Sequence, residues 1–247
     1  WLVVFVFVFV FALVVLFLLS LKQKEQKENL AEVEDQLGNT GKFVKENAKS
    51  LAIIGSAIIA LVILYFGYQN FYLAPRAEKA ANEMFKAEEY VGIDSLKDRA
   101  ISGDGSYPGF ETIAEEYSNT KSANLANAYL GGLYLQKGEY KKAADVLGNY
   151  SNTGSPVIDP LVLGMLGDAY SELKEYSKAI TYYKKAADKS KNSFTSPLFL
   201  KKLGLVYEEQ KEYKSAVEVY TKIRTDFPES VEASFIDAYI ARAEARL

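Results

Sequence analysis

Two serine–lysine pairs are the residues of this chain whose types and spacing come nearest to a catalytic motif. Ser118 and Lys121 match S-x-x-K, a pattern in which a lysine assists a serine nucleophile. Ser171 and Lys174 match the same pattern. Neither pair is accompanied by the Ser-Asp-Asn or Lys-Thr-Gly motifs of such enzymes, and both fall near the ends of predicted helices. We therefore expect structural or solvent-exposed roles for these residues.

The residue types that carry most other enzyme chemistry are absent. The sequence has no histidine and no cysteine, which removes the commonest general base, the thiol nucleophile and most ligand sets for zinc, haem or iron–sulfur clusters. Neighbouring carboxylates such as Glu115 and Glu116 point about 100° apart on a helix and cannot share a proton. The glycine-rich turn around Asp104 lacks the spacing of a calcium or phosphate loop. We predict no enzyme activity, no catalytic residue, no cofactor and no metal.

The overall charge and composition narrow the partners further. The 247 residues carry a formal net charge of -3 without a basic stretch, so nucleic acid is an unexpected partner. Without cysteine the chain can form neither a disulfide nor a lipidated cysteine anchor. Hydrophobic residues make up 49% of the sequence, which is enough for one or two domains with a buried core.

Residues 51–73 form an uncharged apolar stretch that is long enough to cross about 30 Å of hydrocarbon as a helix. Aromatic residues that favour the headgroup region gather at its far end: Tyr65, Phe66, Tyr68, Phe71 and Tyr72. Six lysines precede the stretch, whereas only Arg76 and Lys79 closely follow it. This asymmetry predicts a transmembrane helix with residues 22–50 in the cytoplasm and residues 74–247 outside.

Small residues recur every fourth position on the predicted transmembrane helix, at Ala52, Ser56 and Ala60. Such a stripe allows a second membrane helix to approach closely, and it is also common in helices that simply face lipid. We retain both interpretations, the first as a predicted packing site in the membrane.

Residues 1–21 form another apolar stretch, made almost entirely of Val, Phe and Leu. A first membrane helix running inward would still leave the lysines in the cytoplasm. A cleaved secretory signal fits less well, because no basic region precedes the stretch and no small-x-small cleavage site follows it. The alternation from Val4 to Phe11 favours a strand over a helix. Since Val, Phe and Leu codons share a central U, we favour untranslated T-rich DNA read in frame, with the true start near Lys22.

Three similar segments follow one another in the second half of the chain. They are LGGLYLQKGEYKKAADVL from Leu130, LGDAYSELKEYSKAITYY from Leu166 and LGLVYEEQKEYKSAVEVY from Leu203. Each segment predicts two short amphipathic helices around a turn, with small residues where the helices cross and tyrosine rings filling the gaps. The predicted units cover 124–157, 160–194 and 197–229, and Pro160 and Pro197 are placed at the first helical position of the second and third.

This pattern of Leu-Gly, Tyr, Ala and a closing Pro228 resembles the tetratricopeptide repeat. The resemblance implies a short tetratricopeptide-repeat solenoid over residues 74–247. Together with the predicted single transmembrane helix that precedes it, this gives an all-α fold. Residues 76–92 and 107–121 are expected to form a degenerate first unit. Residues 230–247 are expected to form a C-terminal capping helix.

In the resembled family the first helix of each repeat lines a concave surface, and this surface is the predicted partner-binding groove. The repeat register places Gly132 and Gly164 on it together with ten predicted binding residues: Leu125, Ala128, Leu135, Leu161, Asp168, Glu172, Leu198, Lys201, Leu205 and Glu208. Only Lys201 could contribute to the clamp for a terminal carboxylate that some members use. An apolar groove with an acidic rim suits an extended segment or a partner helix. Alternatively, the last helix of the chain itself fills part of the groove.

Three further segments suggest a biological setting. KQKEQKENLAEVEDQLGNTGKFVKEN, YFGYQNFYLAP and FTSPLFLKKLGLVYEE resemble the Bacteroidetes-type ancillary subunit of the bacterial SecYEG translocon. The resemblance covers residues 22–247 and implies a non-enzymatic, single-pass inner-membrane protein with a periplasmic interaction domain. Its implied partners are SecYEG and a membrane-anchored periplasmic prolyl-isomerase-like chaperone, and its implied role is chaperone recruitment or handling of emerging secreted proteins. A scaffold of another cell-envelope assembly is the alternative. Neither nucleic acid nor a small-molecule substrate is expected.

Overall fold

The computed structural model describes residue 44 and residues 47–247, and every regular element in this part of the chain is a helix. The expected all-α class is therefore confirmed. The predictions for residues 1–21 and for most of 22–50 lie outside the described residues. The chain divides into two compact units, one ending at Phe66 and the other comprising Gly67–Leu247, and each is described by itself.

The first unit contains α3 (Ala48–Gly67), the main part of the predicted transmembrane helix. No residue of α3 is buried, and Ile53 and Leu64 are both 68% exposed. Within the described residues, the helical run that contains α3 is the one helix long and apolar enough to cross a membrane. From Leu51 onward α3 carries no charge and is apolar on all sides, which is unfavourable in water and consistent with a lipid environment.

The second unit begins with η1 (Tyr68–Leu73), a π-helical turn that forms the last six residues of the predicted span. Helix α4 (Ala74–Val91) follows, with Pro75 in its first turn. The guanidinium of Arg76 lies 5.2 Å from the ring centroid of Tyr72 and 5.4 Å from that of Tyr117, and it donates a hydrogen bond to the carbonyl oxygen of Glu116. Arg76 therefore joins the start of α4 to Glu116 and Tyr117.

The degenerate first unit has more than two helices. Helix α4 packs against α5 (Lys97–Ser102), α6 (Phe110–Glu116) and the following helix α7, and a short 3-10 turn, η2 (Asp94–Leu96), precedes α5. The glycine-rich turn between α5 and α6 is organised by Asp104, whose carboxylate accepts hydrogen bonds from Tyr90 and from the backbone N–H groups of Ser106 and Tyr107. The role of Asp104 is thus to hold a turn.

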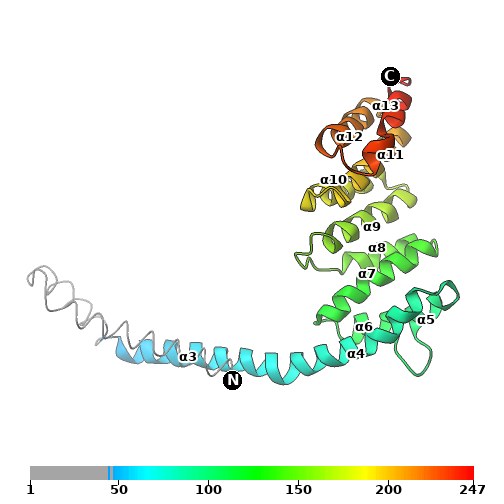
Figure 1. Ribbon diagram of the computed structural model, residues 1–247. Helices are drawn as coiled ribbons and strands as arrows, with labels where there is room; N and C mark the ends of the chain where they lie inside the picture. Colours follow the sequence, from blue (N-terminus) through cyan, green and yellow to red (C-terminus); the bar gives the residue numbers. More distant parts are fainter. Residues whose placement is uncertain (1–43, 45–46) are drawn as a thin grey trace, which may run out of the picture. The chain divides into compact units, whose positions relative to one another are not determined.

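The three predicted units are three helix pairs, which stack one after another in chain order (Figure 1). Their bounds are α7 (Lys121–Gln136) with α8 (Tyr140–Gly148), α9 (Ile158–Glu172) with α10 (Tyr176–Ser190), and α11 (Thr195–Glu209) with α12 (Tyr213–Asp226). Helices α9 and α11 begin two residues earlier than expected, so Pro160 and Pro197 are each the third helical residue. The first four N–H groups of a helix have no intrahelical acceptor, so proline is tolerated there as well.

Glycines let the two helices of a pair cross closely, as expected. A Cβ atom added to Gly204 would lie 2.2 Å from the ring of Tyr220, and one added to Gly167 would lie 2.6 Å from the ring of Tyr183. The rings that fill these gaps come from the second helix of each pair, at the last position of the aligned segments. In the first pair the side chain over the glycine is Leu147.

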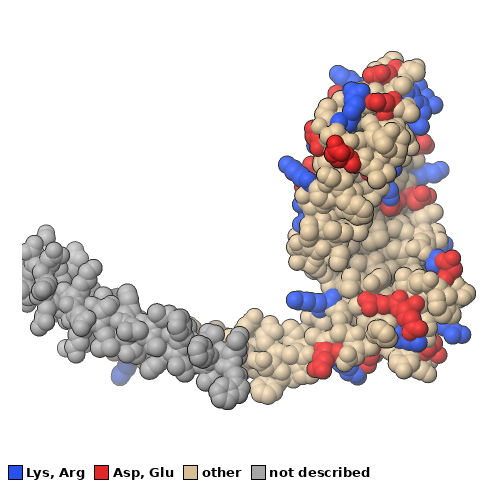
Figure 2. All heavy atoms as spheres, viewed as in Figure 1, with Lys and Arg blue, Asp and Glu red and all other residues tan. Residues whose placement is uncertain are grey.

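The C-terminal segment caps the last pair. The expected single helix from Ser230 is instead a 3-10 turn, η3 (Glu232–Phe235), followed by α13 (Ile236–Glu244). The hydroxyl of Ser230 accepts a hydrogen bond from the N–H of Ala233 and donates one to the carbonyl of Phe227, which favours the tight turn. The apolar face of α13 is buried in one core cluster with α11 and α12. Both signs of charge are interspersed over the helix pairs in Figure 2.

Candidate functional site

An uncharged hollow of about 310 Å³ lies between α7 and α9, and we call it the apolar groove. Three of the predicted groove residues line it, namely Leu125, Ala128 and Leu161. Gly132, which the repeat register also places on the concave surface, lines it as well. The remaining lining residues were not predicted: Val91, Tyr129, Leu133, Gln136, Ile158, Val162 and Met165. The groove can therefore accept apolar side chains without desolvating a charge.

The shape of the apolar groove follows from small residues on α7 and flexible ones on α9. Ala128 and Gly132 are one turn apart, and a Cβ atom added to Gly132 would make only an ordinary contact, 3.6 Å from the sulfur of Met165. Methionine adapts to irregular partners because its side chain is unbranched and polarisable. Tyr129 forms a fixed wall, since its ring stacks on buried Phe110 with centroids 4.8 Å apart.

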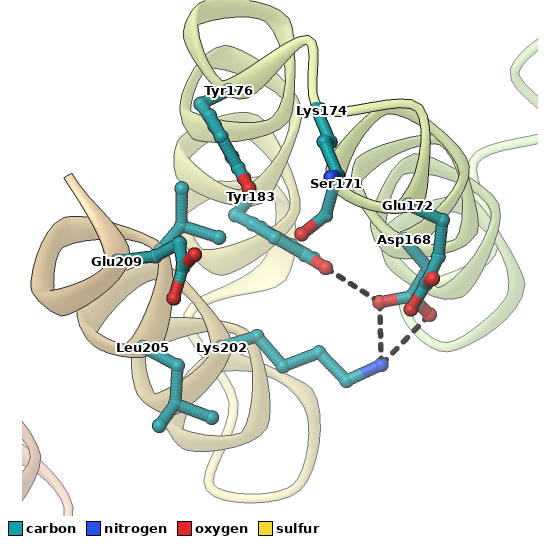
Figure 3. A pocket seen from close by; sticks show the side chains of 10 residues that line it. Asp168, Ser171, Glu172, Lys174, Tyr176, Tyr183, Lys202, Leu205 and Glu209 are labelled. Atoms are coloured by element: carbon teal, nitrogen blue, oxygen red, sulfur yellow. Dashed lines mark hydrogen bonds and ion pairs between the residues drawn. The ribbon is translucent and has the colours of Figure 1, made fainter.

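A second hollow, of about 390 Å³, lies between α9 and α11, and we call it the polar pocket (Figure 3). Its centre is Asp168, which accepts a 2.6 Å hydrogen bond from the hydroxyl of Tyr183. Lys202 donates to both oxygens of the same carboxylate, at 2.6 and 2.7 Å. Burial, with a further contribution from the charge of Asp168, raises the pKa of Tyr183, which therefore remains a neutral donor at physiological pH.

Two further carboxylates line the polar pocket without an ion-pair partner among the described residues, namely Glu172 and Glu209. Leu205 contributes an apolar wall and is 41% exposed. A smaller hollow of about 310 Å³ joins Leu135 of α7 to Asp168 and Glu172. The predicted residues Leu135, Asp168, Glu172 and Leu205 therefore lie together. The apolar groove and the polar pocket follow one another along α9, since Met165 lines the first and Asp168 and Glu172 line the second.

The chain itself covers this face at the third pair. The ammonium of Lys201 lies 3.6 Å from a carboxylate oxygen of Glu232 and 5.0 Å from the ring centroid of Phe235. Glu208 accepts hydrogen bonds from Arg242 at 2.6 and 3.0 Å and from Tyr220 at 2.8 Å. Leu198, the remaining predicted residue, packs against the core that includes α13. The alternative in which the last helix fills part of the groove thus describes the surroundings of Lys201 and Glu208 on α11, whereas Leu205 and Glu209 of the same helix remain exposed beside the polar pocket.

The shifts in the pKa values of Glu208 and Arg242 favour the charged form of both side chains. Burial by itself would raise the pKa of Glu208, but the hydrogen bonds from Arg242 and Tyr220 outweigh it and the pKa is lowered. The hydrogen bond to Glu208 raises the pKa of Arg242 in turn. Both groups remain charged at neutral pH, so the cap is held by a bidentate ion pair.

The residues with catalytic spacing are not assembled into a site. Ser171 lines the polar pocket, but no hydrogen bond joins its side chain to that of Lys174. Ser118 is exposed between α6 and α7 and likewise forms no hydrogen bond to Lys121. The pKa of Asp104 is lowered to about 2, mainly by the hydrogen bond from Tyr90 and to a lesser extent by those from the backbone N–H groups of Tyr107 and Ser106. Within the described residues, no cluster of acidic side chains could hold a metal ion.

The small-residue stripe of α3 lies on the exposed surface of that helix. Ala52, Ser56 and Ala60 are all exposed, and the hydroxyl of Ser56 donates to the carbonyl oxygen of Ile53 at 2.9 Å. The one polar group of the stripe is therefore satisfied within its own helix, as a hydroxyl in lipid requires. Packing of a second helix on this stripe stays a prediction.

The predicted groove did not include three residues that line the polar pocket, namely Lys202, Tyr183 and Glu209. Lys202 follows the predicted Lys201 directly, and one step of about 100° around the helix turns its side chain from the cap toward α9. Tyr183 belongs to the second helix of its pair, where no groove residue was expected. The sequence does contain a sign that Glu209 is exposed. Glu208 and Glu209 are adjacent on a first helix, and two adjacent residues cannot both face the core.

One family comparison bears on these residues. The profile of a family described as YpiA-like, C-terminal tetratricopeptide repeats, matches residues 160–229. No curated protein matches the chain. The matched segment comprises nearly all of α9 to α12, which are the second and third predicted units. The chain thus contains tetratricopeptide-like repeats, a type of domain that generally serves protein–protein interaction.

Proposed function

We propose that this protein is a membrane-tethered, non-enzymatic module that binds other proteins on its open inner face, which consists of the apolar groove between α7 and α9 and the polar pocket between α9 and α11. The observation that carries the proposal is the pairing of an uncharged groove with a polar pocket on a repeat scaffold. The chain covers the equivalent surface of the third pair with its own residues, so this type of surface is suited to packing against a polypeptide.

The cellular setting that we propose is the Sec translocon. The support is the resemblance of residues 22–247 to the translocon's ancillary subunit, together with an apolar α3 that is preceded by six lysines. In this proposal the N-terminus is cytoplasmic and the repeats are periplasmic in the bacterial inner membrane. The repeats would recruit a membrane-anchored prolyl-isomerase-like chaperone or receive emerging secreted chains, and Ala52, Ser56 and Ala60 would face SecYEG.

Site-specific photo-cross-linking in intact membranes tests this function. A photo-reactive residue at Met165 probes the apolar groove, and one at Ser56 probes the small-residue stripe. Glu218, exposed on α12 and outside every hollow described above, is the matched control position. We expect links from Met165 to a periplasmic chaperone or a secreted chain and links from Ser56 to SecY, with neither partner captured at Glu218.

Other outcomes change the proposal in defined ways. Reproducible links from Met165 to a different envelope machine, with no SecY link from Ser56, would replace the translocon by a scaffold role in that assembly. Equal capture at Met165 and Glu218 would show that the inner face has no special function, and the proposed binding site would be abandoned.

A further inference from the structure

The open inner face changes character along its length. Its first part, the apolar groove, is lined by no charged residue. Its second part, the polar pocket, is lined by Asp168, Glu172 and Glu209 and by the two cations Lys174 and Lys202. Asp168 and Lys202 neutralise one another through two short contacts. A partner that lies along the face therefore meets apolar surface first and charged groups second.

The charges that remain are mainly negative. Glu172 and Glu209 extend from α9 and α11 on two sides of the polar pocket, and neither has an ion-pair partner among the described residues (Figure 3). Lys174 is the single opposing cation, and it belongs to the exposed turn after α9. A cationic side chain entering the pocket would gain two carboxylates, whereas an anionic one would face net repulsion.

The covered third pair shows how this face takes a polypeptide. There the C-terminal segment supplies Arg242 to the carboxylate of Glu208, through two hydrogen bonds. It also supplies Phe235, whose ring lies against Lys201. The segment also places the carboxylate of Glu232 3.6 Å from the ammonium of Lys201, so each charged residue of the covered surface pairs with an opposite charge from the chain, and an acidic residue of this face accepts a basic side chain.

We infer that the open inner face binds a partner segment in which apolar side chains occupy the apolar groove and a neighbouring lysine or arginine pairs with Glu172 and Glu209. This inference rests on the proposed function and adds the composition of the bound segment. The groove volume of about 310 Å³ is sufficient for one or two large apolar side chains. Met165 of the groove and Glu172 of the polar pocket both belong to α9, two turns apart on the same side of the helix.

Two synthetic peptides of equal length provide the probe. One carries three leucines at helical spacing followed by two lysines, and the other has two glutamates in place of the lysines. Binding is measured by fluorescence anisotropy to the full chain in phosphatidylcholine nanodiscs, with empty nanodiscs as the blank. We expect the lysine peptide to bind about tenfold more tightly than the glutamate peptide, with a difference that shrinks as salt is added.

Matched variants locate the binding. E172Q/E209Q should lower the affinity for the lysine peptide by about threefold to tenfold and leave the glutamate peptide unchanged or better bound. L161S should weaken both peptides, because Leu161 lines the apolar groove. E218Q, a neutralisation at an exposed position of α12, should change neither. Circular dichroism and thermal unfolding of each variant confirm that the fold is retained.

Each contrary result has a distinct meaning. Equal binding of the two peptides, tighter binding of the glutamate peptide, or affinities that E172Q/E209Q leaves unaltered would overturn the inference. A dimer that L161S converts to a monomer would assign the face to a second copy of the chain and would likewise overturn it. If neither peptide binds while Met165 still cross-links to a specific protein, the composition is wrong and the proposed function stands. If both signals are absent, the proposed function fails as well.

Discussion

Hydrogen bonds from tyrosine hydroxyls to carboxylates recur throughout the helix pairs. Tyr183 donates to Asp168 at 2.6 Å, and Tyr220 donates to Glu208 at 2.8 Å. Each ring fills the space over a glycine, while its hydroxyl reaches the acid on the neighbouring helix. The same residue thus fixes the approach of two helices and orients a charge on the inner face, at no cost in unsatisfied polar groups.

The close approach at Gly204 can be tested by adding one methyl group. Gly204→Ala should lower the free energy of unfolding by about 1–3 kcal/mol, because the new Cβ atom would overlap the Tyr220 ring. Gly132→Ala is the control, since its Cβ atom would have room and alanine favours the helix by up to about 1 kcal/mol. Urea unfolding measures both, and equal stabilities would contradict the tight crossing.

The buried carboxylate of Asp159 should make the stability of the fold depend on pH. It is only 2% exposed and accepts hydrogen bonds from Tyr150 and from the N–H groups of Thr153 and Gly154. Burial opposes its ionisation, but these bonds outweigh burial and lower the pKa of Asp159. A lowered folded-state pKa contributes stability that is present above the unfolded pKa of about 4 and is lost as the pH falls through the folded value.

Asp159→Asn should therefore lower the free energy of unfolding at pH 7 by about 1–3 kcal/mol and flatten its decline toward acid pH. Urea unfolding at pH 7 and near pH 4 tests both effects. Asp145→Asn, at an exposed position of α8, is the matched control and should change neither value. Parallel pH curves for the wild type and Asp159→Asn would exclude this role for the Asp159 carboxylate.

At the scale of elements, each pair turns through one residue with left-handed backbone geometry. The residue is Gly138 in the first pair, with φ of 74°, and Lys174 and Lys211 in the other two, with φ of 59° and 61°. The three positions are equivalent in the repeat. A side chain at such a position is strained, so the second and third turns are held in this geometry by the packing of the helices that they connect.

Substitutions at two of these turns should change the free energy of unfolding in opposite directions. Lys211→Gly should raise the free energy of unfolding by about 0.5–1 kcal/mol, whereas Gly138→Ala should lower it by about 1 kcal/mol. Thermal unfolding of the two variants measures the contrast. A destabilised Lys211→Gly protein would mean that contacts of the lysine side chain outweigh its backbone strain.

At the scale of the whole molecule, the absence of cysteine offers a direct test of topology. Single cysteines placed at Gln36, before α3, and at Ser177, exposed on α10, give two unique labelling sites. If the lysines before α3 stay in the cytoplasm, a membrane-impermeant maleimide should label only S177C in intact spheroplasts and both variants after lysis. Labelling of Q36C alone in intact spheroplasts would reverse the proposed orientation.

Helix pairs and the apolar α3 could be read from the sequence, because both depend on local patterns. Amphipathic spacing, the aligned glycines and an uncharged apolar run act over a few turns of one helix, so residues 160–194 and 197–229 were recognised as units. The earlier starts of α9 and α11 and the 3-10 turn before α13 were missed because the ends of helices respond to neighbouring packing more than to their own residues.

The order and spacing of residues by themselves determined that this is a helical repeat protein with an apolar helix, and the composition determined that it has no histidine and no cysteine. Only the tertiary structure decided which predicted groove residues remain open. Lys201 and Glu208 have the same repeat positions as open residues in other pairs, yet they are covered by Glu232 and Arg242. Lys202 meets Asp168 across 34 residues of sequence. Such pairings depend on how successive helices stack, a long-range property that periodicity within one helix does not encode.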